Sequence, residues 1–134
     1  MIYVVIDTNV FVSAYLTHNL NSATSKVVDA LFRGKVTPLY NEEIMTEYQE
    51  VLSRPHFAIS ANERKALLDY IREHGVAAER VNFDSFFIDE DDRVFYEVAL
   101  SEEDSFLVTG NLKHFPADSR VVTPSQMLEI LAQK

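Results

Sequence analysis

The sequence contains no cysteine and no tryptophan, and it has only 3 glycines and 4 prolines among 134 residues. The absence of cysteine excludes disulfide-stapled scaffolds, thiolate zinc sites and thiol nucleophiles. The scarcity of glycine and proline, together with 47% hydrophobic residues, excludes a disordered or low-complexity chain. We therefore expect a single folded domain over residues 1–134, in which any metal ion has mainly oxygen ligands.

A long hydrophobic run is also missing. The apolar segment Ile2–Ile6 has only five residues before it meets Asp7. It is too short for a membrane span, and it lacks the basic leader of a signal peptide. We expect a cytoplasmic protein with no membrane association.

Basic residues are few, since 12 Lys and Arg stand against 21 Asp and Glu, giving a net charge of -9. This balance argues against strong non-specific nucleic-acid binding, which usually needs a basic face. Two explanations of the acidity stay open. The acids are either ordinary solvated surface groups, or a minority of them converge to hold cations.

Strand and helix patterns alternate along the chain. Extended segments are predicted at 2–6, 36–40, 76–83, 106–109 and 121–122, and helices at 9–16, 22–32, 41–52, 60–74, 89–100 and from 123 onward. Helix caps are predicted at Asn41, at Ser60 with Glu63, and at Thr123 with Gln126. This alternation predicts an α/β fold with a central, mainly parallel sheet covered by helices on both faces.

Several acids are expected at one edge of that sheet. Asp7 ends the first strand, whose unbroken apolar run indicates burial on both faces, and ligands of such sheets gather beyond the carboxyl ends of the strands. Asn111 follows a later strand, and Asp91 and Asp92 begin a helix. Glu47 lies beside the apolar stripe of the 41–52 helix, from which it can join them.

Each of these residues also has an ordinary explanation when it is taken alone. Asp7 is well placed to cap a helix, and Glu47 is compatible with a solvated helix surface. The acids 89–92 complement the positive end of a helix. Asn111 and His114 are typical turn residues.

In their order along the chain, four short motifs resemble those of the PIN-domain nucleases. They are Val5-Ile6-Asp7-Thr8-Asn9-Val10, Glu47-Tyr48-Gln49-Glu50-Val51-Leu52, Asp91-Asp92 followed by Ala99, and Val108-Thr109-Gly110-Asn111. The resemblance spans nearly the whole chain. Within the family, the chain is most similar to the toxin components of type II toxin-antitoxin pairs, in which the segment Arg54-Pro55-His56-Phe57 also has counterparts. The resemblance implies a PIN-like three-layer α/β/α sandwich whose acidic pocket binds Mg²⁺ or Mn²⁺ and hydrolyses RNA.

The resemblance also implies catalytic roles. Asp7 would be the central metal ligand, and Glu47 would bind or orient the same ion. Asp92 aligns with the third acid of the family, with Asp91 as the weaker candidate beside it. Many members have a fourth acid where this chain has Asn111, so we expect one tightly bound ion and a weaker second site.

Other positions are assigned supporting roles by the same resemblance. Thr8, Asn9 and Thr109 would hold the carboxylates by hydrogen bonds. Arg54, Lys113 and His114 are candidate RNA contacts. The expected partners are RNA, an inhibitory antitoxin protein and a second copy of the chain. The aromatic pair Phe86 and Phe87 is assigned to core or loop packing rather than to a dimer surface.

Two other functions are compatible with parts of this pattern. A phosphatase of the haloacid dehalogenase type needs a second acid two residues after the first, and Asn9 occupies that position. The stronger rival is a PIN-like scaffold with weak or no catalysis that acts as a protein- or RNA-binding module. Asn111 and the negative net charge both favour that rival.

Overall fold

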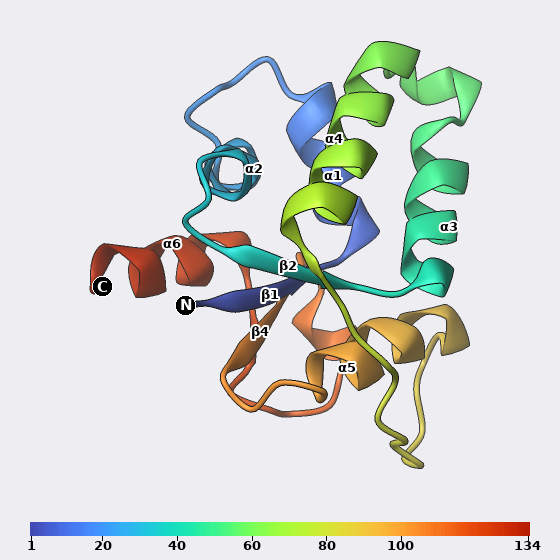
Figure 1. Cartoon of the computed structure of the whole chain (residues 1–134), viewed down its shortest axis with the longest axis vertical. Coiled ribbons are helices and arrows are strands. Elements are labelled where there is room, and N and C mark those ends of the chain that lie inside the picture. The colour runs from blue at the N-terminus through green and yellow to red at the C-terminus, as the bar shows by residue number, and fades with distance from the viewer.

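The computed structural model describes residues 1–134 and contains a parallel sheet of five strands (Figure 1). The strands lie in the order β3-β2-β1-β4-β5. Their bounds are β1 Tyr3–Ile6, β2 Thr37–Tyr40, β3 Val76–Ala77, β4 Ser105–Val108 and β5 Val121–Val122. The α-helices are α1 Thr8–Leu16, α2 Ala23–Phe32, α3 Glu42–Leu52, α4 Ala61–His74, α5 Arg93–Ala99 and α6 Pro124–Ala132. Short 3₁₀ turns occupy Pro55–Phe57, Glu90–Asp92 and Leu112–His114.

The helices cover both sides of the sheet, as Figure 1 shows: α1, α3 and α4 lie on one side and α5 lies on the other, while α2 packs against α6. The central strand is fully enclosed, since Val4 and Val5 are 0% exposed. The predicted α/β/α sandwich with a parallel sheet is therefore confirmed. No helix is both long and apolar enough to cross a lipid bilayer.

The order of the strands creates a switch point beside β1. From β1 the chain adds β2 and β3 on one side, and it then returns to add β4 and β5 on the other side. Ile6 pairs with Val108 in register, and the backbone N–H of Asp7 donates to the Val108 carbonyl at 2.9 Å. Ligand sites of open α/β sheets lie at such points, beyond the carboxyl ends of the strands. The residues that follow β1 and β4 therefore meet where a site is expected.

The predicted helix caps are all present. The Asn41 side chain accepts a hydrogen bond from the Ile44 N–H at 2.9 Å. Reciprocal capping boxes join Ser60 to Glu63 and Thr123 to Gln126. Because each cap satisfies backbone donors that have no partner within the helix, these local signals set where the helices begin.

Two predicted elements were wrong in extent. The extended segment predicted at 76–83 is a strand only at Val76–Ala77, because β2 ends at Tyr40 and offers no further backbone partners. The helix predicted at 89–100 begins as a 3₁₀ turn, since the Asp89 side chain accepts from the Asp91 N–H, and α5 itself starts at Arg93.

The aromatic pair at the end of this segment divides between core and surface. Phe87 is 3% exposed and packs edge-on against Phe115. Phe86 is 84% exposed. The assignment to packing is therefore right for Phe87, which joins the aromatic core, and wrong for Phe86, which is exposed to solvent.

Candidate active site

Asp7 lies at the switch point with its carboxylate largely buried. The residue is 7% exposed, and its Oδ2 accepts a hydrogen bond from Thr109 Oγ1 at 2.8 Å. Asp7 does precede α1, but its side chain makes no capping hydrogen bond. The Asp7 side chain is directed across to Thr109, which follows β4, and the backbone N–H groups at the start of α1 stabilise its charge as well.

The hydroxyl of Thr109 makes two hydrogen bonds, of which the one to Asp7 is the first. Thr109 is 0% exposed, and its hydroxyl also accepts from the Asn111 N–H at 3.1 Å. Thr109 thus connects Asp7 to the turn after β4. The side chain of Asn111 is exposed and forms no hydrogen bond with another residue, so it faces solvent.

Helix α3 is hydrogen-bonded to the two residues that flank Asp7, Ile6 and Thr8. The hydroxyl of Thr8 donates to the Glu47 carboxylate, and the buried Tyr48 hydroxyl donates to the Ile6 carbonyl at 2.5 Å. Glu47 and Tyr48 are neighbours on α3, as Ile6 and Thr8 are the neighbours of Asp7. These two bonds fix the middle of α3 against the junction of β1 and α1.

We expect Tyr48→Phe to lower the free energy of unfolding by about 1–2 kcal/mol, because it leaves the buried Ile6 carbonyl without this donor. Urea denaturation of the two proteins measures the difference. Tyr40→Phe is the control, since the Tyr40 hydroxyl makes no hydrogen bond within the chain. Equal stability of Tyr48→Phe and the wild type would show that the bond to Ile6 contributes nothing.

Asp92 comes from the opposite side of the sheet, at the start of α5. Its Oδ2 lies 3.3 Å from Nδ1 of His114, which belongs to the turn Leu112–His114 after β4. Asp91 is exposed and makes no side-chain contact, although its charge acts on Glu47. His114, predicted as an RNA contact, is therefore engaged with a predicted metal ligand.

The side chains of the remaining predicted residues form no hydrogen bond with these acids. The side chain of Asn9 is exposed, and only its backbone N–H, with that of Thr8, stabilises the Asp7 carboxylate. Lys113 and Arg54 are exposed and form no salt bridge, Arg54 lying seven residues beyond Glu47. The roles assigned to these residues stay predictions.

The three carboxylates are close enough to repel one another. Burial is the main cause that raises the pKa of Asp7, and burial followed by the charges of Asp7, Asp91 and Asp92 raises the pKa of Glu47. Burial, and then the charges of Asp7 and Asp89, raise the pKa of Asp92 to about 6. Hydrogen bonds from Thr109, Thr8 and His114 oppose these shifts. The acids thus form one electrostatically coupled group that favours an added positive charge.

This coupling predicts a pH-dependent stability. The pKa of Asp92 is raised from 3.8 to about 6, so its folded form ionises less readily than its unfolded form, and its contribution to stability falls as pH rises through this window. Asp92→Asn should match the wild type near pH 3.5 and exceed it by on the order of 1–2 kcal/mol above pH 6.5 in chelator. Urea denaturation across this range measures the difference. The exposed Asp104→Asn should show no such trend, and a pH-independent effect of Asp92→Asn would contradict the assignment.

The donor atoms at this edge suit a hard divalent cation. They are oxygens of carboxylate, hydroxyl and amide groups, which Mg²⁺ and Mn²⁺ prefer. No three acidic or histidine side chains are close enough here to bind one ion together. Glu47 is instead bonded to Thr8, and Asp92 to His114. The chemistry of the donor set fits, and joint coordination requires Glu47 and Asp92 to exchange these partners for the ion.

Sequence reasoning missed two supporting residues. Tyr48 was identified only within the motif that begins at Glu47, and the hydroxyl contact of Tyr48 with Ile6 has no local signal. Glu97 was not singled out, although it is 4% exposed and accepts from Arg80 Nε at 2.7 Å and from the Phe83 N–H at 2.9 Å. The sequence signal for Glu97 is its position within the apolar run 94–99, because an acid buried in such a run needs hydrogen-bonding partners.

Comparison with known protein families identifies the family of this chain. The family model described as PIN domain matches residues 3–113. That range includes Asp7, Glu47 and Asp92 together with Thr8 and Thr109, and it ends one residue before His114. The chain belongs to the PIN-domain family, whose members are generally nucleases. No curated protein matches the chain.

Proposed function

We propose that this protein is a metal-dependent endoribonuclease and the toxin of a toxin-antitoxin pair. The observation that carries the proposal is the electrostatic coupling of Asp7, Glu47 and Asp92 at the switch point. The three residues come from separate elements. The charge of Asp7 raises the pKa of both Glu47 and Asp92, and the charge of Asp92 raises that of Glu47. A folded chain tolerates such repulsion where a cation relieves it.

Asp7 is the residue best placed to be the central ligand. Its buried carboxylate is already held by Thr109, so little side-chain freedom is lost when it binds an ion. Glu47 and Asp92 would complete the set from opposite faces of the sheet. Bound Mg²⁺ or Mn²⁺ would supply a water activated as nucleophile and would neutralise charge on the phosphodiester.

Asn111, in the turn after β4, limits the number of metal ions that the site can hold. Asn111 offers an amide oxygen without charge, and its side chain is directed to solvent. A second ion at this position would therefore have fewer charged ligands than the first. We propose one tightly held ion, with any second ion bound only when a substrate phosphate is present.

We assign the approach of RNA to three basic residues outside the acidic group, namely Arg54, Lys113 and His114. Lys113 and Arg54 are exposed and free of salt bridges, which leaves them available to phosphates. His114 adjoins Asp92 and is the closest of the proposed contacts to the acids. Because these basic residues are few and the protein is acidic, we expect substrate binding to be weak and sensitive to salt.

The toxin role rests on the motif similarity at residues 54–57 together with the acidic group. An antitoxin would inhibit the enzyme by placing a basic side chain among the acids, because that charge relieves the same repulsion as a metal ion. A homodimer is proposed as well. Phe86 is exposed beyond the core and offers an apolar contact for a second copy.

A binding module without catalysis is the second candidate, favoured by the uncharged Asn111 and by the separation of the three carboxylates. Cleavage of single-stranded RNA and DNA with Mn²⁺, with Mg²⁺ and with chelator separates the candidates, using Asp7→Asn prepared identically as the control for contaminating nucleases. Metal-dependent cleavage of RNA that the variant lacks supports the nuclease. RNA binding without cleavage in either metal supports the module.

A further inference from the structure

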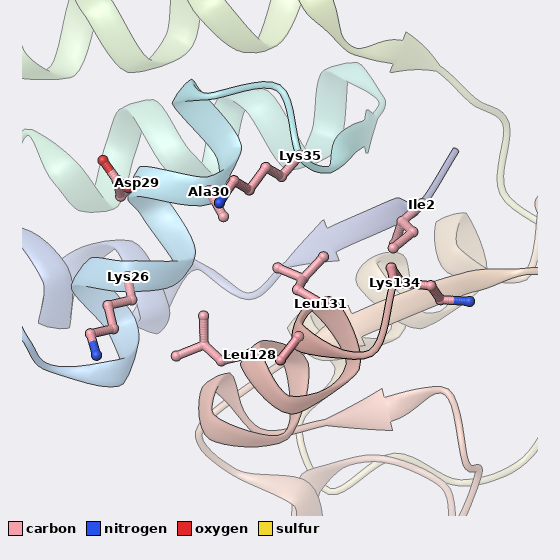
Figure 2. Close-up of a pocket in the computed structure, with 9 residues that line it drawn as sticks. Ile2, Lys26, Asp29, Ala30, Lys35, Leu128, Leu131 and Lys134 are labelled. Carbon is pink, nitrogen blue, oxygen red and sulfur yellow. The ribbon is translucent and has the colours of Figure 1, made fainter.

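A cavity of about 700 Å³ lies between α2, α6 and the start of β1, away from the acidic group (Figure 2). Its apolar lining consists of Ile2, Ala30, Leu128, Leu131 and Ala132. Ile2 precedes β1, whereas Asp7 follows it, so the cavity lies at the edge of the sheet opposite to the acidic group. None of the residues assigned to the nuclease site lines it.

The rim of this cavity is positively charged, in contrast to the protein as a whole. Six basic residues form no salt bridge, namely Lys26, Lys35, Arg54, Arg64, Lys113 and Lys134. Three of the six, all lysines, line this one cavity. The only acid in the lining, Asp29, is paired with Arg33 at 2.7 Å. Unpaired cations are therefore concentrated here on a chain whose net charge is -9.

The arrangement of the lysines constrains the ligand. Figure 2 shows Lys26, Lys35 and Lys134 at separate places around Leu128 and Leu131, without convergence on one point. A lone phosphate is best bound by donors that converge on it. Separated ammonium groups around an apolar floor instead match a ligand with separated anionic groups around an apolar side chain.

We propose that this cavity binds an acidic peptide segment of a partner protein, in which a leucine or another bulky apolar residue is flanked by Asp and Glu. The apolar side chain occupies the floor formed by Leu128 and Leu131, and the flanking carboxylates pair with the lysines. The negative charge of the rest of the surface disfavours binding of acidic segments elsewhere. The lysines therefore attract the acidic peptide and also restrict its binding to this cavity. This binding is independent of the nuclease function.

The test uses amide NMR spectra of the full chain titrated with a blocked peptide of about ten residues that alternates glutamate with leucine. We expect shift changes at residues 26–35 and 128–134. The double variant Lys26→Gln with Lys35→Gln should weaken binding about fivefold or more, and 0.5 M salt should weaken it similarly. The matched control, Arg64→Gln with Lys65→Gln, removes the same charge on α4 and should leave the affinity unchanged.

Further probes separate the alternatives. A peptide with glutamine in place of glutamate should bind much more weakly, and Ala132→Glu, an exposed change on the rim, should weaken the acidic peptide without depending on core packing. The proposal is overturned if the acidic peptide shifts no amides in these segments, or if the lysine and control variants weaken it equally. It is also overturned if inorganic phosphate or anionic lipid vesicles produce the shifts and the peptide does not.

Discussion

Asp7→Asn is expected to lower the rate of metal-dependent RNA cleavage by at least about 100-fold and, in the same protein without metal, to raise the temperature of unfolding. The loss of rate follows because the amide brings no charge to the position proposed for the central metal ligand. The gain in stability follows because burial raises the pKa of Asp7, so that its ionised form destabilises the folded protein at neutral pH. A purely structural role of Asp7 predicts the opposite change in stability.

Single-turnover cleavage in Mn²⁺ and thermal unfolding in chelator measure the two effects. The amide oxygen of asparagine can still accept from Thr109, so the variant should fold with the same contacts. Asp104→Asn removes an exposed carboxylate after α5 and serves as the matched control. Retained cleavage in Asp7→Asn would show that Asp7 is not the central ligand, and a lower unfolding temperature would contradict the electrostatic argument.

Glu97→Ala is expected to lower the free energy of unfolding by about 2–3 kcal/mol, the larger of the stability effects predicted for this protein. Glu97 lies on α5 and holds the irregular segment after β3 through Arg80 and Phe83. The backbone N–H of Val81 also donates to the Glu97 carbonyl at 3.0 Å. Without the carboxylate, the Phe83 N–H and the Arg80 guanidinium lose their buried acceptor.

Urea denaturation and amide hydrogen exchange test this prediction, and exchange should accelerate first in residues 78–88. Glu43→Ala is the matched control because Glu43 pairs with the same Arg80 at 2.9 Å but is exposed. Exposed ion pairs contribute little, so this control should cost about 0.5 kcal/mol or less. Equal losses in the two variants would show that burial of Glu97 is not what makes its contacts strong.

The fold was largely predictable from local sequence. Asn41, Ser60 and Thr123 set helix starts through hydrogen bonds to residues three positions away, and such contacts are encoded within a few residues. The unbroken apolar run before Asp7 likewise predicted a strand buried on both faces. The segment 76–83 failed because the length of a strand depends on its neighbour, and β2 ends at Tyr40.

The candidate site was predictable only in part. Asp7, Glu47 and Asp92 were identified from their order along the chain and from a family resemblance, and their catalytic roles stay predictions. Tyr48 was recognised as part of a motif but not as a donor to Ile6, 42 residues away. Long-range contacts of this kind have no periodic signal in the sequence.

The sequence by itself determined the class of fold, the beginnings of the helices, the burial of β1 and the exclusion of thiol chemistry, because these follow from composition, periodicity and short-range hydrogen bonds. Tertiary structure decided the rest. It directed Asp7 to Thr109, paired Asp92 with His114, and gathered three lysines around one cavity. These outcomes depend on the strand order β3-β2-β1-β4-β5, which brings residues about 100 positions apart into contact.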